Sequence, residues 1–364
     1  MPKLHHCSSR FVWQFCTVIL VVIAIASCQG RDEKVKYSSS DTADCRTIEH
    51  EAGQTQICET ARCAGSPRWR DCRVRGQPER IVVLGPFILE ALLALDVQPL
   101  AYADYFAFHP RDYDNPSQQI SYLGHLIKGS IANVGTAEQP SFEEILQVQP
   151  DLIIGTTANN SQYETLSQIA PTILFERNEP ETILRGVAQA VNRSGQAEQV
   201  LTEVEQRMAA ARKSFAPIVQ AHPQLLLLSS SKLQRIDLIT SYFNCASVIE
   251  NLGFKLVSPP EIKNSQTNRL HPISIETLPE LNNADSVILL GHNFSELENT
   301  DDFTAHQLSQ LKQAWSNNAI AQSMDASKAG RVYFIPTYLC AGLPGTIGTE
   351  LYLKELEKQL LSAN

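Results

Sequence analysis

The sequence is poor in aromatic residues and has no excess of positive charge. Only 7% of its 364 residues are Phe, Trp or Tyr, and the three Trp residues are Trp13, Trp69 and Trp315. Lys and Arg number 30 against 39 Asp and Glu, which gives a net charge of −9. Recognition of nucleic acids needs clustered basic residues, because the phosphate contacts are electrostatic. The composition therefore argues against a nucleic-acid partner, while the length leaves room for two globular domains.

Motifs of the common enzymes and metal sites are also missing. The chain has no Gly-x-Ser-x-Gly, His-Glu-x-x-His or Gly-x-x-x-x-Gly-Lys sequence, and no Cys-x-x-Cys pair. Five histidines in the body of the chain match no pattern of metal ligands: His109, His125, His271, His292 and His306. We therefore expect no enzyme, no cofactor and no directly bound metal. The alternatives of another class are an extracytoplasmic hydrolase and a lipoprotein scaffold.

The first 27 residues have the features of an export signal. Lys3 and Arg10 precede an apolar run over residues 11–26, which ends at small residues before Cys28. This pattern resembles the bacterial lipobox, in which the signal is removed and the cysteine is acylated. The alternative is an uncleaved anchor helix. Both interpretations place the protein outside the cytoplasm, in the periplasm, and tether it to a membrane, with Cys28 as the lipid site in the first.

Six further cysteines follow Cys28, and an even number in an exported chain favours disulfides. Cys45 and Cys58 flank two short alternating segments that predict a β-hairpin, so we expect them to pair. Cys63 and Cys72 are predicted to close the irregular loop that follows. The last two, Cys245 and Cys340, are either paired or free.

From residue 80 onward, short apolar runs alternate with helical patterns, which is typical of an α/β protein. Strands are predicted at residues 81–84, 99–101, 151–155, 225–228 and 285–291. A stretch without Gly or Pro over residues 196–215 predicts a long helix between two lobes of related build, with Pro217 as its stop signal. The predicted organisation is a signal at 1–27, a tether at 28–44, a hairpin and Cys-containing loop at 45–78, lobes at 79–194 and 217–364, and the helix at 195–216.

Several segments of this pattern resemble the helix-linked, class III periplasmic binding proteins, which deliver ferric siderophores, ferric citrate, haem or cobalamin to an ABC importer. The resemblance covers roughly residues 45–360 and rests on residues 77–84, 90–99, 134–143, 149–154, 273–276 and 330–334. It implies two similar α/β lobes with mostly parallel sheets joined by one rigid helix. It also implies a ferric siderophore or ferric citrate as ligand and an ABC permease dimer in the inner membrane as partner. Haem and cobalamin stay open as ligands of the same fold, and we expect a monomer.

Two glutamates occupy equivalent places in the lobes. Glu143 and Glu276 each come two residues after a serine, Ser141 and Ser274, that would cap a helix. Acidic residues are favoured in a first helical turn by the helix dipole alone. The family resemblance implies a different role, in which each carboxylate meets basic residues of the permease. Glu144 has a structural explanation as a capping-box partner.

Ligands of open α/β sheets bind beyond the carboxyl ends of the strands. An anionic ferric chelate also needs nearby cations, and Lys232 and Arg235 follow a predicted strand, although both have an alternative as solvated loop charges. The aromatic candidates could equally be core edges. The predicted ligand residues are Phe87, Tyr105, Phe106, Asn159, Lys232, Arg235, Tyr242, His292 and Tyr338.

Overall fold

The computed structural model describes residues 45–58, 74–75, 77–107, 109–177, 179–259, 262, 270–294 and 302–361. The predicted signal, the tether, Cys28, Cys63 and Cys72 lie outside these ranges. Within them, no helix combines the length and apolar character that a membrane span requires.

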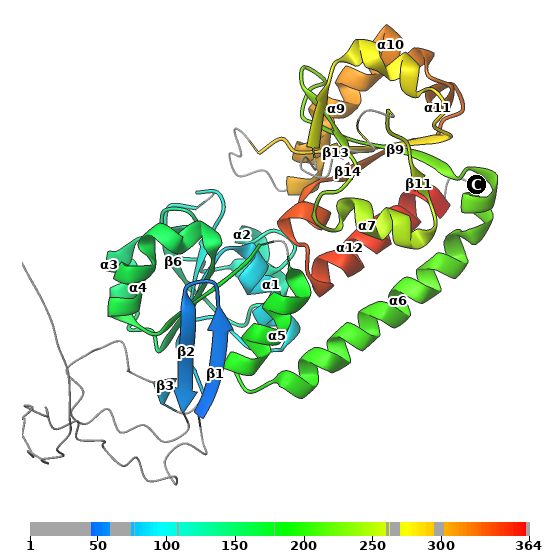
Figure 1. The fold of residues 1–364 in the computed structure, drawn as a ribbon. Coiled ribbons are helices and arrows are strands. Elements are labelled where there is room, and N and C mark those ends of the chain that lie inside the picture. Colours follow the sequence, from blue (N-terminus) through cyan, green and yellow to red (C-terminus); the bar gives the residue numbers. More distant parts are fainter. Residues whose placement is uncertain are drawn as a thin grey trace, which may run out of the picture. The chain divides into compact units, whose positions relative to one another are not determined.

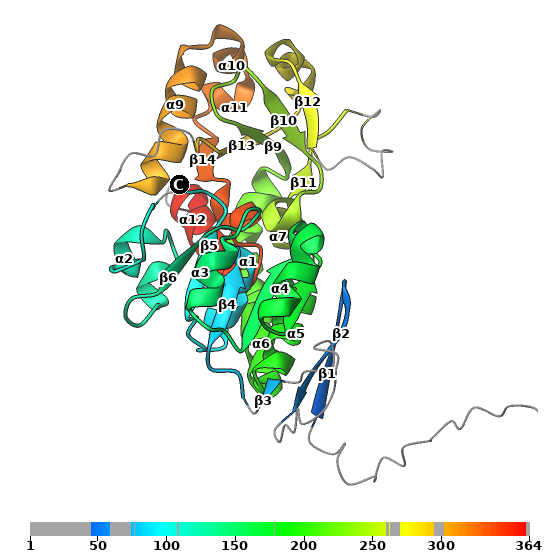
Figure 2. The same cartoon turned by 90° about the vertical axis from the view of Figure 1, so that its left-hand side faces the viewer.

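The predicted hairpin is confirmed at the start of the described chain. Strands β1 (Cys45–His50) and β2 (Gly53–Cys58) pair antiparallel, and β3 (Val74–Arg75) pairs parallel with β2. Ile48 and Ile57 are fully buried in the core of the first lobe. The hairpin lies against α5 (Pro180–Ala190), where the Gln189 side chain donates to the Thr47 carbonyl at 3.0 Å (Figures 1 and 2). The hairpin is therefore an integral part of the N-terminal lobe.

The N-terminal lobe is built on a five-stranded parallel sheet of order β6-β5-β4-β7-β8. Its strands are β4 (Ile81–Leu84), β5 (Ala101–Asp104), β6 (Ala132–Thr136), β7 (Leu152–Thr156) and β8 (Thr172–Phe175). Four of the five are buried along their whole length, as expected of a parallel sheet covered on both faces. The helical segments are α1 (Pro86–Ala94), α2 (Pro116–Gln119), η2 (Gly124–Leu126), α3 (Phe142–Gln147), η3 (Thr157–Gln162), α4 (Tyr163–Ile169) and α5.

One predicted strand is displaced. Residues 99–101 were expected to form the second strand of the lobe, but β5 begins only at Ala101 and continues to Asp104. Pairing with β4 starts at Leu100, whose amide donates to the Ile81 carbonyl at 2.8 Å. The preceding Pro99 has no amide proton to contribute to such pairing.

Helix α6 (Ser194–Ala221) connects the lobes and has 28 residues, or roughly 42 Å at 1.5 Å per residue (Figure 1). The prediction that Pro217 ends it is wrong, because the helix continues through the proline. Phe215 is fully buried, and Ile218 and Val219 pack on the core of the second lobe. These apolar contacts hold the last turn in place and offset the hydrogen bond that proline cannot donate.

The C-terminal lobe contains a six-stranded sheet of order β12-β10-β9-β13-β14, with β11 also paired to β9. Its β10 pairs antiparallel with both neighbours, and the other pairs are parallel. The strands are β9 (Gln224–Ser230), β10 (Ile236–Ile239), β11 (Lys255–Leu256), β12 (Leu270–Ile273), β13 (Ser286–Gly291) and β14 (Val332–Pro336). The helical segments are α7 (Phe243–Leu252), η4 (Ile275–Leu281), α9 (Phe303–Asn317), α10 (Ala319–Ser323), α11 (Asp325–Lys328), η5 (Tyr338–Gly342), α12 (Thr346–Leu356) and η6 (Glu357–Leu361). Two α/β lobes joined by one long helix confirm the predicted fold class.

Candidate functional site

Residues at the carboxyl ends of β4, β5 and β8 gather on the N-terminal lobe. Gly85, with φ of 109°, turns the chain from β4 into α1 and brings Phe87 to the first helical turn. The Phe87 ring meets the Tyr105 ring edge-on, with centroids 5.5 Å apart. The guanidinium carbon of Arg177 lies 5.1 Å from the Phe87 centroid and 5.0 Å from that of Tyr105. The structure thus brings two predicted residues together with a cation that sequence reasoning missed.

Arg177 comes two residues after β8, so the rule that ligands bind beyond strand ends would have nominated it. It was missed because residues 172–175 were not recognised as a strand. Its Nε atom is buried and has no hydrogen-bond partner. A buried N–H group without a hydrogen-bond partner lowers the stability of the fold, so its presence at Arg177 calls for an explanation.

The C-terminal lobe contributes a second set of aromatic residues. Tyr242 precedes α7 and packs on Phe243, with ring centroids 4.8 Å apart. The Phe243 ring in turn lies 5.6 Å from Phe87 of the other lobe. Tyr338 lies in η5 and is packed into the core of the N-terminal lobe with only 5% of its surface exposed. Several predicted ligand residues of the two lobes are therefore neighbours.

Aromatic rings of the two lobes also contact each other directly. Phe106 stacks on Phe294 at 4.9 Å, and Tyr122 stacks on Tyr338 at 5.7 Å between centroids. The Tyr122 hydroxyl is 2.9 Å from the hydroxyl oxygen of Thr304 in α9. A cavity of about 370 Å³ lies elsewhere, along α6 and α7, and none of the predicted ligand residues lines it. The place predicted for a ligand is thus occupied by the protein's own aromatic side chains.

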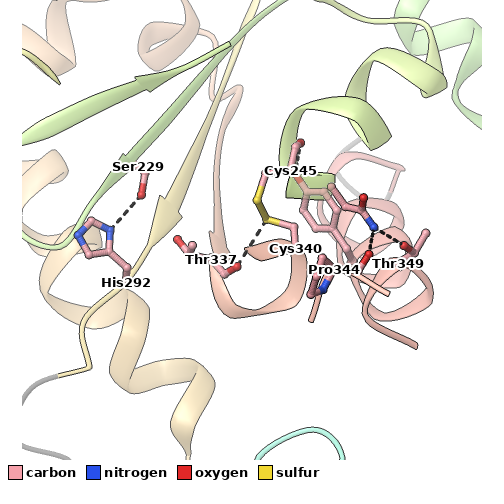
Figure 3. Close-up of a disulfide and its surroundings, with 9 residues drawn as sticks. Ser229, Cys245, His292, Thr337, Cys340, Pro344 and Thr349 are labelled. Atoms are coloured by element: carbon pink, nitrogen blue, oxygen red, sulfur yellow. Dashed lines mark hydrogen bonds between the residues drawn. A yellow bond between two sulfur atoms is a disulfide. The ribbon is translucent and has the colours of Figure 1, made fainter. Parts of the chain in front are cut away.

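His292 follows β13 and is held by the neighbouring strand. Its Nδ1 atom is 3.0 Å from the Ser229 hydroxyl oxygen at the end of β9 (Figure 3). Burial lowers the pKa of His292, and the Asp237 carboxylate opposes this effect. The imidazole is therefore neutral at neutral pH.

The two basic residues predicted for the ligand lie on the exposed loop between β9 and β10. Lys232 is exposed, and the side chain of Arg235 is 76% exposed with its Nε atom 3.5 Å from Asp237. The Ser230 hydroxyl donates to the Arg235 carbonyl at 2.7 Å and fixes the loop backbone. Neither side chain meets the aromatic groups described above.

The side chain of Asn159 forms hydrogen bonds within the N-terminal lobe. It is fully buried, and its amide donates to the Ala137 carbonyl at 2.7 Å and to the Gln162 side chain at 3.0 Å. Its oxygen accepts from the Thr156 amide. These bonds tie η3 to the end of β7, so the group is used within the N-terminal lobe.

A buried carboxyl group lies next to Tyr105. Asp104 is 4% exposed and accepts a hydrogen bond from the Tyr105 amide at 2.6 Å. Burial raises the pKa of Asp104 to about 6, although that hydrogen bond opposes the shift. Burial also raises the pKa of Tyr102, Tyr105 and Tyr338, so these phenols are neutral hydrogen-bond donors at neutral pH.

Groups suited to a directly bound metal are not evident in the part of the chain that the structure describes. Within it, no group of three or more His, Cys, Asp or Glu side chains is placed to hold a metal ion. The hydroxyls, the imidazole and the guanidinium are better suited to the oxygen atoms of an organic ligand.

One disulfide fixes the segment that carries Tyr338. Cys245 in α7 and Cys340 in η5 are joined, with Cα atoms 4.9 Å apart (Figure 3). Of the two states left open for these cysteines, the structure has the paired one. Cys45 and Cys58 are opposite each other in the β1–β2 register, and their disulfide stays a prediction.

The two lobes are also linked by Glu90, which the sequence analysis did not single out. This α1 residue is 1% exposed and accepts hydrogen bonds from the amides of Gly345 (2.9 Å) and Gly348 (2.6 Å) at the start of α12. A Cβ atom on Gly345 would lie 2.8 Å from the Glu90 carboxyl, so a side chain there would displace it. A carboxylate of one lobe thus caps a helix of the other.

Glu143 and Glu276 are both exposed and lie in the first turns of α3 and η4. The Ser141 hydroxyl caps α3 by accepting from the Glu144 amide at 3.3 Å, as predicted. The matching prediction for Ser274 is wrong, because its side chain makes no cap hydrogen bond to η4. The Ser274 hydroxyl lowers the pKa of Glu276.

Comparison with known proteins gives consistent matches. The family model described as periplasmic binding protein matches residues 81–339. YhfQ of Bacillus subtilis, named as a candidate ABC transporter substrate-binding lipoprotein, is 25% identical over 357 residues, which cover 95% of this chain and 97% of YhfQ. The Fe(3+)-citrate-binding protein YfmC of the same organism is 24% identical, with 90% and 89% covered. Staphylococcus aureus SirA complexed with staphyloferrin B shares the fold, with a TM-score of 0.66 at 20% identity over 87% of this chain and 98% of SirA.

Proposed function

Since the chain belongs to the periplasmic binding protein family, we propose that it binds a ferric chelate, a siderophore or ferric citrate, between its two lobes and delivers it to an ABC importer. The relatives named above include a ferric-citrate-binding protein and a siderophore-bound structure. On this proposal the chain is a binding protein that catalyses no reaction, and the ferric chelate is its cargo.

The observation that carries the proposal is the convergence of strand-end residues from both lobes. Phe87 of one lobe meets Phe243 of the other, with ring centroids 5.6 Å apart. Tyr105 and Arg177 pack on Phe87 within the first lobe, and Tyr242 packs on Phe243 within the second. Aromatic faces and polar donors at the meeting point of two lobes suit a ligand with a flat organic scaffold and oxygen groups. Because the rings are now in contact, ligand entry requires the lobes to part at this point.

A titration of the purified protein tests this function. Ferric citrate, a ferric hydroxamate, a ferric catecholate, haem and cobalamin are added separately, and quenching of intrinsic fluorescence is followed. We expect at least one ferric chelate to bind with a dissociation constant below about 100 μM. Failure of all five to bind would refute the proposal, and turnover of an added ester or peptide substrate would refute the absence of catalysis.

The proposed docking surface comprises Glu143, Glu276 and two exposed apolar residues of α3. Phe142 is 36% exposed and Leu146 is 61% exposed, one helical turn apart and next to Glu143. Exposed apolar groups beside a carboxylate are typical of protein interfaces. We propose that each lobe contacts one permease subunit through its glutamate.

The double variant Glu143→Ala/Glu276→Ala tests docking separately from ligand binding. Import by the reconstituted transporter should fall by more than in either single variant, because loss of one partner from a desolvated charge pair typically costs about 2–5 kcal/mol. Chelate affinity and stability should stay unchanged, and Glu144→Ala serves as the neighbouring control. Normal import by the double variant would leave both glutamates with the helix-dipole role alone.

The anchoring proposal rests on the sequence before Cys45 and on relatives such as YhfQ, whose name includes lipoprotein. We propose that Cys28 carries the lipid that holds the protein at the periplasmic face of a membrane. Wild-type protein should incorporate labelled palmitate in growing cells, and the variant Cys28→Ser should not. Wild-type protein that carries no label would favour an uncleaved anchor helix.

A further inference from the structure

The start of α12 is held in place by both lobes. From the N-terminal lobe, the Glu90 carboxyl group of α1 accepts hydrogen bonds from the Gly345 and Gly348 amides. From the C-terminal lobe, the Asn244 side chain at the start of α7 donates to the Pro344 carbonyl (Figure 3). The segment that opens α12 is therefore fixed between one helix of each lobe.

The connecting helix holds α12 as well. Arg207 of α6 is paired with Glu350 at 3.4 Å and with Glu357 at 2.5 Å between nitrogen and oxygen atoms. These side chains are all partly buried, between 25% and 35% exposed. Helix α12 thus contacts α1 of one lobe, α7 of the other and the helix that joins them (Figure 1).

The contact between Glu90 and α12 is closely packed. The Glu90 side chain is 1% exposed, and the cavity beside it measures about 10 Å³, roughly the space that one water molecule needs. None of the other side chains that line this cavity carries a charge. Gly345 leaves room for the carboxyl group, since a Cβ atom there would lie 2.8 Å from it. Separation of α1 from α12 would leave buried backbone amides without their acceptor, which is costly.

The aromatic contacts between the lobes are of a different kind. Phe106 with Phe294 and Tyr122 with Tyr338 are ring pairs, 4.9 and 5.7 Å apart between centroids. Ring pairs are individually weak, and their separation leaves no backbone amide unpaired. The lobes can therefore part at these rings at a smaller cost than at Glu90.

We propose that the contact between Glu90 and the start of α12 is the pivot on which the two lobes turn, and that it stays closed while the aromatic contacts open to admit the ferric chelate. Glu90 is then a positioning residue, which touches no ligand but sets how the strand ends of the lobes face each other. Phe87 lies one turn before Glu90 in α1, and Phe243 directly precedes Asn244 in α7, so the pivot fixes both elements that carry this facing pair of rings. The inference rests on the proposed function.

The test compares variants that loosen opposite ends of the contact between the lobes. Glu90→Gln keeps one acceptor oxygen and places an NH₂ group against the second amide. At about pH 8, above the raised pKa of Glu90, the dissociation constant should rise about 3- to 10-fold for each ferric chelate that the wild type binds, ferric citrate first, because the binding arrangement of the lobes is then only partly populated. Tyr122→Phe loosens the aromatic end and should lower the dissociation constant. A residue that only held the lobes together would act in the same direction as Tyr122.

Two glycine variants reach the same contact from α12 and provide its control. Gly345→Ala should weaken chelate binding by a similar factor, because the added methyl group displaces the Glu90 carboxyl. Gly195→Ala is the matched control, since Gly195 lies in the first turn of α6 and a Cβ atom there has no neighbour within 4 Å. It should change the affinity less than about 2-fold. Circular dichroism and unfolding curves establish that each variant is folded.

Hydrogen exchange followed by mass spectrometry shows whether the pivot stays closed. The Gly345 and Gly348 amides should exchange equally slowly with and without bound chelate, and faster in Glu90→Gln. Faster exchange of these amides on chelate binding would overturn this inference alone, as would unchanged or tighter binding by a folded Glu90→Gln variant. Failure of every ferric chelate to bind the wild type would overturn the proposed function and this inference with it.

Discussion

Glu90 offers a quantitative test of the contact between the lobes, through the variant Glu90→Gln. The carboxyl group is 1% exposed, and burial raises its pKa from the ordinary 4.5 to about 7, although the amides of Gly345 and Gly348 oppose the shift. Burial therefore favours the protonated form in the native protein. The unfolded chain exposes the group and ionises it near its ordinary pKa.

The sign of the pH dependence follows from this raised pKa. Between about pH 4.5 and pH 7 the native state holds a proton that the unfolded state has lost, so stability falls as the pH rises. From about pH 5 to pH 8 the loss attributable to Glu90 is about 2.5 kcal/mol, since one pKa unit corresponds to about 1.4 kcal/mol. Glutamine does not titrate and should abolish this slope. Its amide cannot accept both backbone hydrogen bonds equally well, but that difference is constant with pH.

The assay is urea unfolding of wild type and Glu90→Gln at several values between about pH 5 and pH 8. The free energy of unfolding of wild type should fall by about 2.5 kcal/mol more than that of the variant over this interval. Glu144→Gln is the exposed control and should follow wild type. Parallel curves for wild type and Glu90→Gln would refute the reasoning, because Glu90 would then titrate alike in the native and unfolded states.

Two further predictions concern the segments that meet near Tyr338. The disulfide closes a loop with a sequence separation of 95, so its removal in Cys245→Ala/Cys340→Ala should lower the free energy of unfolding by about 4–5 kcal/mol. Wild-type stability that does not change on reduction would contradict this prediction. Tyr122→Phe removes the hydrogen bond to Thr304 and should lower the free energy of unfolding by about 1 kcal/mol. Because the contact between the lobes is then weaker, the affinity for ferric citrate should rise a few-fold. A titration that shows weaker binding would contradict this prediction.

The alternation of strands and helices could be predicted from the sequence because each element depends on local pattern. Residues 81–84 and 225–228 are continuous apolar runs, and the structure buries them in parallel pairs as such runs require. The end of α6 could not be predicted in this way. The helix continues past Pro217 because Ile218 and Val219 reach the core of the other lobe, a contact that no local signal contains.

In the candidate site, too, local sequence pattern predicts some residues, whereas others depend on contacts between distant segments. The strand-end rule directs attention to Tyr105 and Phe87, whose rings the structure brings together, but it cannot tell a buried amide such as Asn159 from a group free for a ligand. Arg177 was within reach of the rule once β8 was recognised. Glu90 was not, because its partners are 255 and 258 residues away and its own helix is apolar.

The contacts between aromatic residues also bear on how tightly a ligand can bind. Phe106 with Phe294 and Tyr122 with Tyr338 join the lobes directly, so an incoming chelate must replace these contacts. Such pairs contribute about 0.5–1.5 kcal/mol each, so two of them lower the ligand affinity by about 5- to 150-fold. A micromolar dissociation constant corresponds to about 8 kcal/mol, which leaves most of the binding free energy intact. The arrangement therefore keeps the lobes together without ligand at a moderate loss of affinity, because the aromatic contacts that a chelate replaces are few and individually weak.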